Sequence, residues 1–166
     1  PRPAAPLALA PFMNQTPIMP RSHLQSFVFP GRRANWILGE GLEVTIGHHA
    51  EAVILQKFIH WTGRLWDYDQ FIHEEYARGE QEFQDDPPES GWVEKTADDI
   101  LSESIPSLSR HAIRKHLKSL VRKEFLYERE DPVYPWEHVL QYRVNLVKLR
   151  KALARRGYHL DERDFG

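Results

Sequence analysis

The sequence contains no cysteine, and it has no apolar run long enough to cross a membrane. The absence of cysteine excludes a disulfide framework and a cysteine-ligated zinc site, and it suits a reducing compartment. Because no membrane-spanning run and no signal peptide are evident, we expect a cytoplasmic protein without a membrane partner. The chain also lacks an HExxH motif, a glycine-rich phosphate loop and a nucleophile elbow, so the sequence predicts neither an enzyme nor a cofactor.

The net charge is low, at −2 over 166 residues, but the charges are unevenly distributed. Between Leu65 and Glu103 there are thirteen acidic residues and two basic ones, a balance of −11. Between Arg110 and Arg156 there are thirteen basic residues and five acidic ones, a balance of +8. Because local field rather than net charge steers a polyanion, the basic stretch could face DNA while the acidic stretch faces away.

The length indicates one domain with terminal extensions. Residues 1–22 contain six prolines and are expected to form an extended tail. Residues 23–47 are expected to form a β-hairpin extension, with strands at 27–29, 35–38 and 42–46 and a turn at Gly39-Glu40-Gly41. The main domain would span residues 48–166 and carry an acidic insertion at 66–91.

The strongest helical pattern outside the basic half runs from His49 to Trp61. Its apolar residues cover one face of the helix and extend past it. We therefore expect a core helix that is buried on more than one side, and not a functional site. In the insertion, apolar residues at helical spacing from Tyr68 to Tyr76 predict a short amphipathic helix. Residues 79–91, with five acids and two prolines, predict a mobile loop.

A basic helix is predicted from Arg110 to Lys123. Ser109 is well suited to cap its first turn, and an apolar stripe is formed by Ile113, Leu117, Leu120 and Val121. The face away from this stripe carries no negative charge and five positive ones, which would suit phosphates: Arg110, Arg114, Lys115, Lys118 and Arg122. The alternative interpretation is a solvated basic face on a plain helical hairpin.

The elements around this helix predict a winged helix-turn-helix. Thr96-Ala97-Asp98-Asp99 resembles a capping box that opens a shorter helix, which should end by about Ser104, before Pro106. Strand-forming runs follow at 125–129, with Phe125 and Tyr127 inward, and at 139–144, while 91–94 should form a small first strand. The expected fold class is therefore mainly α with a small β wing (α+β), with the N-terminal β extension added.

The last predicted helix begins after Asn145, a good N-cap, and ends before Gly157. Its apolar row consists of Leu146, Leu149 and Leu153. Lys148 and Lys151 are among the basic residues on its other side. These could extend the phosphate-binding surface, or they could simply favour the negative end of the helix dipole.

Several segments resemble the winged-helix domains of phage and plasmid replication proteins: Glu51–Trp61 (EAVILQKFIHW), Gly91–Thr96 (GWVEKT), Ser109–Leu117 (SRHAIRKHL) and Gln141–Asn145 (QYRVN). The resemblance covers about Glu51 to Tyr158, and its motifs are mostly structural. It implies a bacterial or mobile-element module that binds duplex DNA in replication initiation or transcription regulation, with recognition by Arg110, His111, Arg114, Lys115 and Lys118. The long acidic insertion departs from the family pattern, as does Glu124, which replaces the usual glycine before the first wing strand.

Two other functions compete with DNA binding. The first is protein–protein docking within a larger complex, through the aromatic wing and the acidic patch. The acidic wing loop carries Tyr134 and Trp136, which could bind a protein partner or a second copy of the chain. These two side chains could also fold back onto the core, which is favoured. An enzyme or metal protein would need a ligand set, for which His48, His49 and Glu51, or His73, Glu74 and Glu75, are candidates. No two-histidine spacing with a third ligand matches a known metal motif, so the sequence predicts no metal site.

Overall fold

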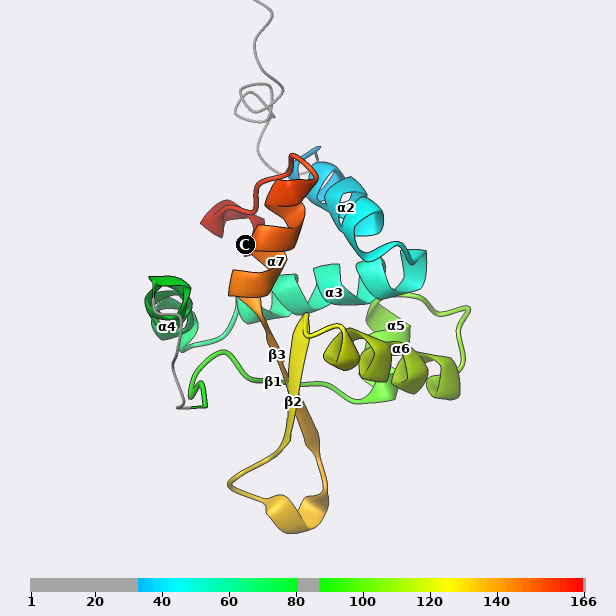
Figure 1. Ribbon diagram of the computed structural model, residues 1–166. Coiled ribbons are helices and arrows are strands. Elements are labelled where there is room, and N and C mark those ends of the chain that lie inside the picture. The colour runs from blue at the N-terminus through cyan, green and yellow to red at the C-terminus, as the bar shows by residue number, and fades with distance from the viewer. Residues whose placement is uncertain (1–32, 81–86, 166) are drawn as a thin grey trace, which may run out of the picture.

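The computed structural model describes residues 33–80 and 87–165, and the described part is a mixed α+β structure (Figure 1). The expected tail at 1–22, the expected strand at 27–29 and residues 81–86 of the expected loop lie outside this part. The helices are α2 (Arg33–Ile46), α3 (His49–Thr62), α4 (Tyr68–Glu80), α5 (Ala97–Glu103), α6 (Arg110–Arg122) and α7 (Leu146–Arg155), with 3-10 turns at Pro135–Glu137 and Glu162–Phe165. The strands are β1 (Val93–Glu94), β2 (Leu126–Glu130) and β3 (Leu140–Val144).

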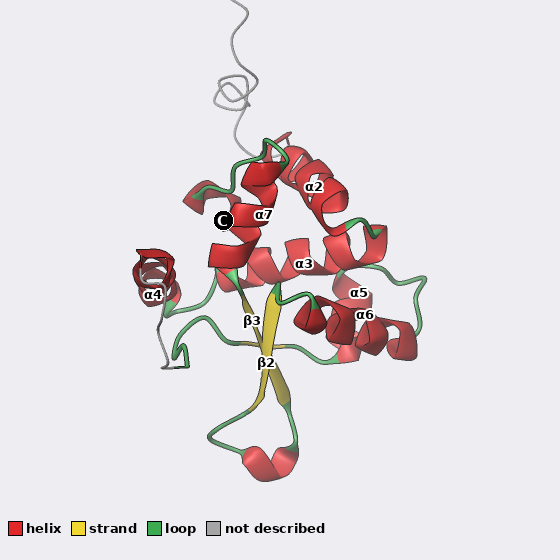
Figure 2. Cartoon of the chain, in the orientation of Figure 1, coloured by secondary structure: helices red, strands yellow, loops and turns green. Residues whose placement is uncertain are grey.

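The three strands form one antiparallel sheet in the order β1-β3-β2. Figure 2 shows the two longer strands, β2 and β3, running in yellow from below α3 to the loop that joins them. Val93 lies opposite Tyr142, and Leu126 lies opposite Val144. The prediction of three strands in these segments is confirmed. The expected facing of β2 is only partly correct, because Leu126 is buried and Tyr127 is half-buried.

Helix α3 is the centre of the core. Ile54, Leu55, Phe58 and Ile59 are all fully buried, which confirms that this helix is covered on more than one side. The ring of Phe58 packs edge-on against Trp61 and against Tyr142 of β3. Figure 1 shows α3 running between α2 and α7 on one side and the sheet, α5 and α6 on the other. Because α3 packs against elements on both of its sides, it provides a rigid support for α6.

The predicted hairpin at 35–46 is wrong, because Arg33–Ile46 is one helix. Leu42 and Ile46, one helical turn apart, are buried. Gly41, part of the predicted turn, instead permits close packing, since a Cβ there would lie 2.9 Å from the ring of Tyr158. The helix ends before Gly47, whose φ of +74° is the left-handed conformation that glycine adopts without strain.

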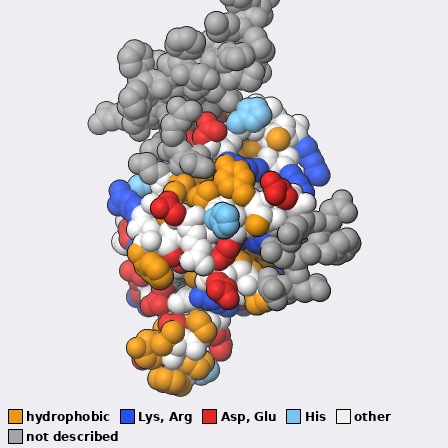
Figure 3. All heavy atoms as spheres, turned by 90° about the vertical axis from the view of Figure 1, so that its left-hand side faces the viewer, with side chains coloured by type: hydrophobic (Ala, Val, Ile, Leu, Met, Phe, Trp, Pro, Cys, Tyr) orange, Lys and Arg blue, Asp and Glu red, His pale blue; other side chains and the backbone are white. Residues whose placement is uncertain are grey.

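Helix α4, within the acidic insertion, packs into the folded core. The expected short helix is confirmed as α4, which extends to Glu80 and buries Phe71 completely. Gly91, with a φ of +80°, lies so close to Phe71 that a Cβ there would be 2.3 Å from its ring. Figure 3, which shows the α4 side, has several acidic side chains on this face and a hydrophobic group at the wing tip below it.

Among the described residues, no helix is both long enough and apolar enough to span a membrane.

Candidate nucleic-acid interface

Helix α6 is stabilised by local features that are visible in the sequence, namely its N-cap and its apolar stripe. Ser109 has extended backbone angles, and its hydroxyl accepts a hydrogen bond from the Ala112 N–H at 3.1 Å. Of the predicted apolar stripe, Ile113, Leu117 and Leu120 are buried in the core, and Val121 is half-buried. The opposite face of the helix is therefore left to solvent.

All six predicted DNA-binding residues on α6 are exposed: Arg110, His111, Arg114, Lys115, Lys118 and Arg122. All but Arg110 line a groove of about 550 Å³, together with Val121 and with Glu128 of β2. The groove thus has one acidic residue on its β2 side. Burial raises the pKa of the Tyr142 phenol on β3 well above its ordinary value, and the nearby Glu128 carboxylate raises it further.

Helix α5 and the turn after it hold the start of α6. The predicted capping box is confirmed: Asp99 N–H donates to the Thr96 hydroxyl at 3.2 Å, and Thr96 N–H donates to the Asp99 carboxylate at 2.9 Å. The Thr96 N–H, followed by its hydroxyl, lowers the pKa of Asp99. Arg110 Nε donates to Asp98 Oδ1, so the first basic residue of α6 is directed towards α5 and away from the groove.

Helix α6 ends in a Schellman motif with a non-glycine residue in the left-handed position. Glu124 N–H donates to Val121 O at 2.9 Å, and Phe125 N–H donates to Leu120 O at 3.0 Å. Glu124 has a φ of +61°, a conformation that costs a residue with a Cβ about 1–2 kcal/mol. Glu124 therefore holds, under strain, a backbone conformation that glycine would adopt freely.

The two candidate residues on α7 do not join the groove. Lys148 Nζ forms an ion pair with the Glu124 carboxylate and lies over the ring of Phe125. Lys151 is exposed beside α4, in a separate pocket of about 220 Å³ that also contains Tyr76. Figure 1 shows α4 and α6 on opposite sides of the molecule. Lys151 therefore belongs to a different surface from the α6 residues.

The wing projects away from the core and ends in an aromatic pair. Tyr134 is 50% exposed and Trp136 is 68% exposed, and their rings meet edge-on with centroids 5.7 Å apart. The expectation that they fold back onto the core is therefore wrong. The 3-10 turn between the wing strands holds them at the tip, where Glu130 and Glu137 are also exposed.

Sequence reasoning missed a contact that fastens α6 to α3. Glu51 is 4% exposed, and its Oε2 accepts a hydrogen bond from Lys123 Nζ at the end of α6, at 2.6 Å. Its Oε1 lies 3.7 Å from His116 Nδ1 in the middle of α6. Helix α3 is thus more than an apolar core helix. The apolar periodicity of α3 could not reveal this contact, because the partners of Glu51 come from a distant segment of the chain.

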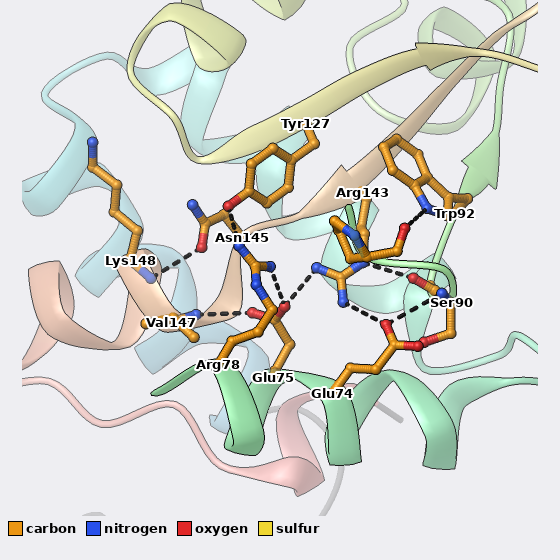
Figure 4. A network of polar contacts seen from close by, with 12 residues as sticks. Glu74, Glu75, Arg78, Ser90, Trp92, Tyr127, Arg143, Asn145, Val147 and Lys148 are labelled. Atoms are coloured by element: carbon orange, nitrogen blue, oxygen red, sulfur yellow. Dashed lines mark hydrogen bonds and ion pairs between the residues drawn. The ribbon is translucent and has the colours of Figure 1, made fainter. Parts of the chain in front are cut away.

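A second missed feature is the buried guanidinium of Arg143 in β3 (Figure 4). It donates to Glu75 Oε1 at 2.5 Å, to Glu74 Oε2 at 3.3 Å and to the Ser90 carbonyl at 2.6 Å. The other oxygen of Glu75 accepts the Val147 N–H at 3.0 Å. These contacts commit Glu74 and Glu75 to structure, which argues against the candidate metal set that included them with His73.

Comparisons of the chain with protein-family models, with curated proteins and with solved structures found no match.

Proposed function

We propose that this chain is a winged helix-turn-helix module that binds duplex DNA, with α6 in the major groove and β2 and β3 as its wing. Helices α5 and α6 would form the helix-turn-helix. The observation that carries the proposal is the exposed, acid-free face of α6, whose Arg114, Lys115 and Lys118 line one groove. The role proposed for such a module is replication initiation or transcription regulation in a bacterium or mobile element.

The rigid support of α6 favours specific contacts with base edges over nonspecific electrostatic attraction to DNA. Leu117 and Leu120 anchor the helix in the core, and Lys123 ties its end to Glu51. A helix held in this way presents its outward side chains in a fixed array, which direct readout in the major groove requires. Phosphate contacts would come from Lys118 and Arg122.

The wing is acidic, and this shapes the expected complex. Glu128, Glu130 and Glu137 are exposed. Their carboxylates would repel phosphates within the screening length of about 10 Å. We therefore expect the duplex to lie along α6, with the wing tip directed away from the phosphate backbone.

A titration at several salt concentrations tests this function. The Arg114/Lys118/Arg122→Ala variant should lose most of its DNA affinity, and its log–log salt slope should fall by about 0.9 for each phosphate that is no longer neutralised. Fluorescence anisotropy with DNA selected from a random pool would measure both quantities.

A matched control variant lies on α7. Lys151/Arg155/Arg156→Ala removes the same charge from exposed positions. It should keep most of the affinity, because Lys151 lies beside α4 and not beside α6. Equal losses in the two triple variants would mean that net charge, and not the α6 face, attracts the DNA.

A docking function is the second candidate, and the exposure of Tyr134 and Trp136 favours it. Two aromatic rings at an exposed tip are typical of interface anchors. In this alternative the wing binds a protein partner or a second copy of the chain. Sedimentation of wild type and of Tyr134/Trp136→Ser would detect self-association. Loss of a dimer in the variant, with no DNA binding by wild type, would favour docking over DNA recognition.

A further inference from the structure

Two histidines and a buried glutamate converge where the N-terminus of α3 meets α6. His48 immediately precedes α3, Glu51 is in its first turn, and His116 is in the middle of α6. One potential ligand atom from each residue lies within 4.8 Å of the other two. The two imidazole rings are in contact, with centroids 4.7 Å apart. The three side chains therefore converge on a common point.

The chemistry of Glu51 suits a metal ligand. Burial opposes its ionisation, but hydrogen bonds from Lys123 and Ser119 outweigh this and hold the pKa of the carboxyl below its ordinary value. Lys123 occupies Oε2, whereas Oε1 is directed towards His116. Carboxylates that ligate metal ions are themselves usually hydrogen-bonded by a neighbouring group, and Lys123 supplies this hydrogen bond to Glu51.

His48 is the N-cap residue of α3, but the hydrogen bond by which it caps the helix is long. Its Nδ1 accepts from the Glu51 N–H at 3.5 Å, which is longer than the usual range of about 2.7–3.2 Å. Asparagine, aspartate, serine and threonine are the preferred capping residues. The same side chain is exposed, so an ion could reach the three residues from solvent.

We propose that His48, Glu51 and His116 bind a divalent transition metal ion of the zinc class, which joins the start of α3 to α6. Two imidazole nitrogens and one carboxylate oxygen are a known zinc ligand set, completed by water. Ligands of a tetrahedral zinc ion lie about 3.3 Å apart, so side-chain shifts of about 1 Å would complete the site. This inference goes beyond DNA binding and does not depend on it.

Cobalt(II) is a suitable probe, because its visible absorption reports tetrahedral coordination. The full chain, without a histidine tag and stripped with a chelator, should bind one cobalt ion per chain, and zinc should displace it. His48→Asn keeps a good capping residue. His48→Asn and His116→Asn should each weaken binding by more than the roughly 10–100-fold that loss of an orienting neighbour causes.

His49→Asn is the matched control, because His49 is adjacent and exposed but outside the cluster. It should bind cobalt as wild type does. Zinc should raise the melting temperature of wild type and of this control, but not of His48→Asn. The proposal is overturned if wild type gives no tetrahedral spectrum, or if His48→Asn and His49→Asn bind cobalt equally. Neither readout involves DNA, so failure here is distinguishable from failure of the proposed function.

Discussion

Arg143 Nη1 lies 2.5 Å from Glu75 Oε1, and both side chains are almost completely buried. The pair joins β3 to α4, and it thereby links the acidic insertion to the sheet. Arg143 also stacks its guanidinium on the ring of Phe71, at 4.8 Å from the centroid. The local excess of acid on α4 is therefore partly neutralised from within the fold.

Removal of one partner should be costly. Arg143→Met should lower the free energy of unfolding by about 3–5 kcal/mol, because Glu75 would keep a buried charge without its main partner. Arg78→Met is the matched control, since Arg78 donates to the same Glu75 oxygen at 2.8 Å but is partly exposed. It should cost less. Urea denaturation measures both, and equal costs would contradict the role given to Arg143.

Stability should fall in acid through Glu74. Burial opposes its ionisation, but Ser90, whose N–H donates to Glu74 at 3.2 Å, and the charge of Arg143 outweigh this and hold the pKa of the carboxyl below its ordinary value. A carboxyl with a lowered folded pKa contributes stability above its unfolded pKa and loses it as pH falls through the folded one. Urea denaturation of wild type and Glu74→Gln should therefore show a stability difference at about pH 6 that shrinks towards about pH 3. A difference independent of pH would contradict this.

The strained turn at Glu124 offers a stabilising substitution. Glu124→Gly should raise the free energy of unfolding by about 1 kcal/mol, because glycine adopts the positive φ without a Cβ clash. Glu124→Ala removes the same ion pair with Lys148 but keeps the Cβ, so it should give no gain. Thermal and urea denaturation would compare the three proteins. If the alanine variant gains as much as the glycine variant, the backbone is not the cause.

Single substitutions on α6 should separate base contacts from phosphate contacts. Arg114→Ala should cost about 1–3 kcal/mol of binding free energy and relax the preference at one base pair. Lys118→Ala should weaken binding to all sequences alike and lower the salt slope by about one. Anisotropy titrations against a set of single-base variants would measure these effects. Identical profiles for the two variants would contradict the assignment of separate roles.

The candidate interface was largely predictable because it depends on one helix. Spacing alone placed Ile113 and Leu117 inward and Arg114 and Lys118 outward, and Ser109 marked the first turn. Residues on other elements were harder to place. Lys148 is paired with Glu124, and Arg110 with Asp98. Their charges are obvious in the sequence, but their partners depend on how the helices pack.

The wrong prediction of a hairpin at 35–46 has a similar origin. Gly39 and Gly41 are typical turn residues, and the apolar runs beside them suit strands. In the structure a close approach of α2 to Tyr158 and Leu153 explains Gly41. Tertiary packing overrode the local preference of this segment, as it often does where glycine permits two elements to meet.

By itself the sequence determined the elements that periodicity and capping define: α3, the α5 capping box, the amphipathic α6, the wing strands and α7. These follow from contacts between residues a few positions apart, or from alternation along a strand. Only the tertiary structure decided that Arg143 is buried with Glu75, and that His48, Glu51 and His116 converge. These residues come from segments that are distant in the sequence. A local sequence pattern contains no information about how close such segments lie in space.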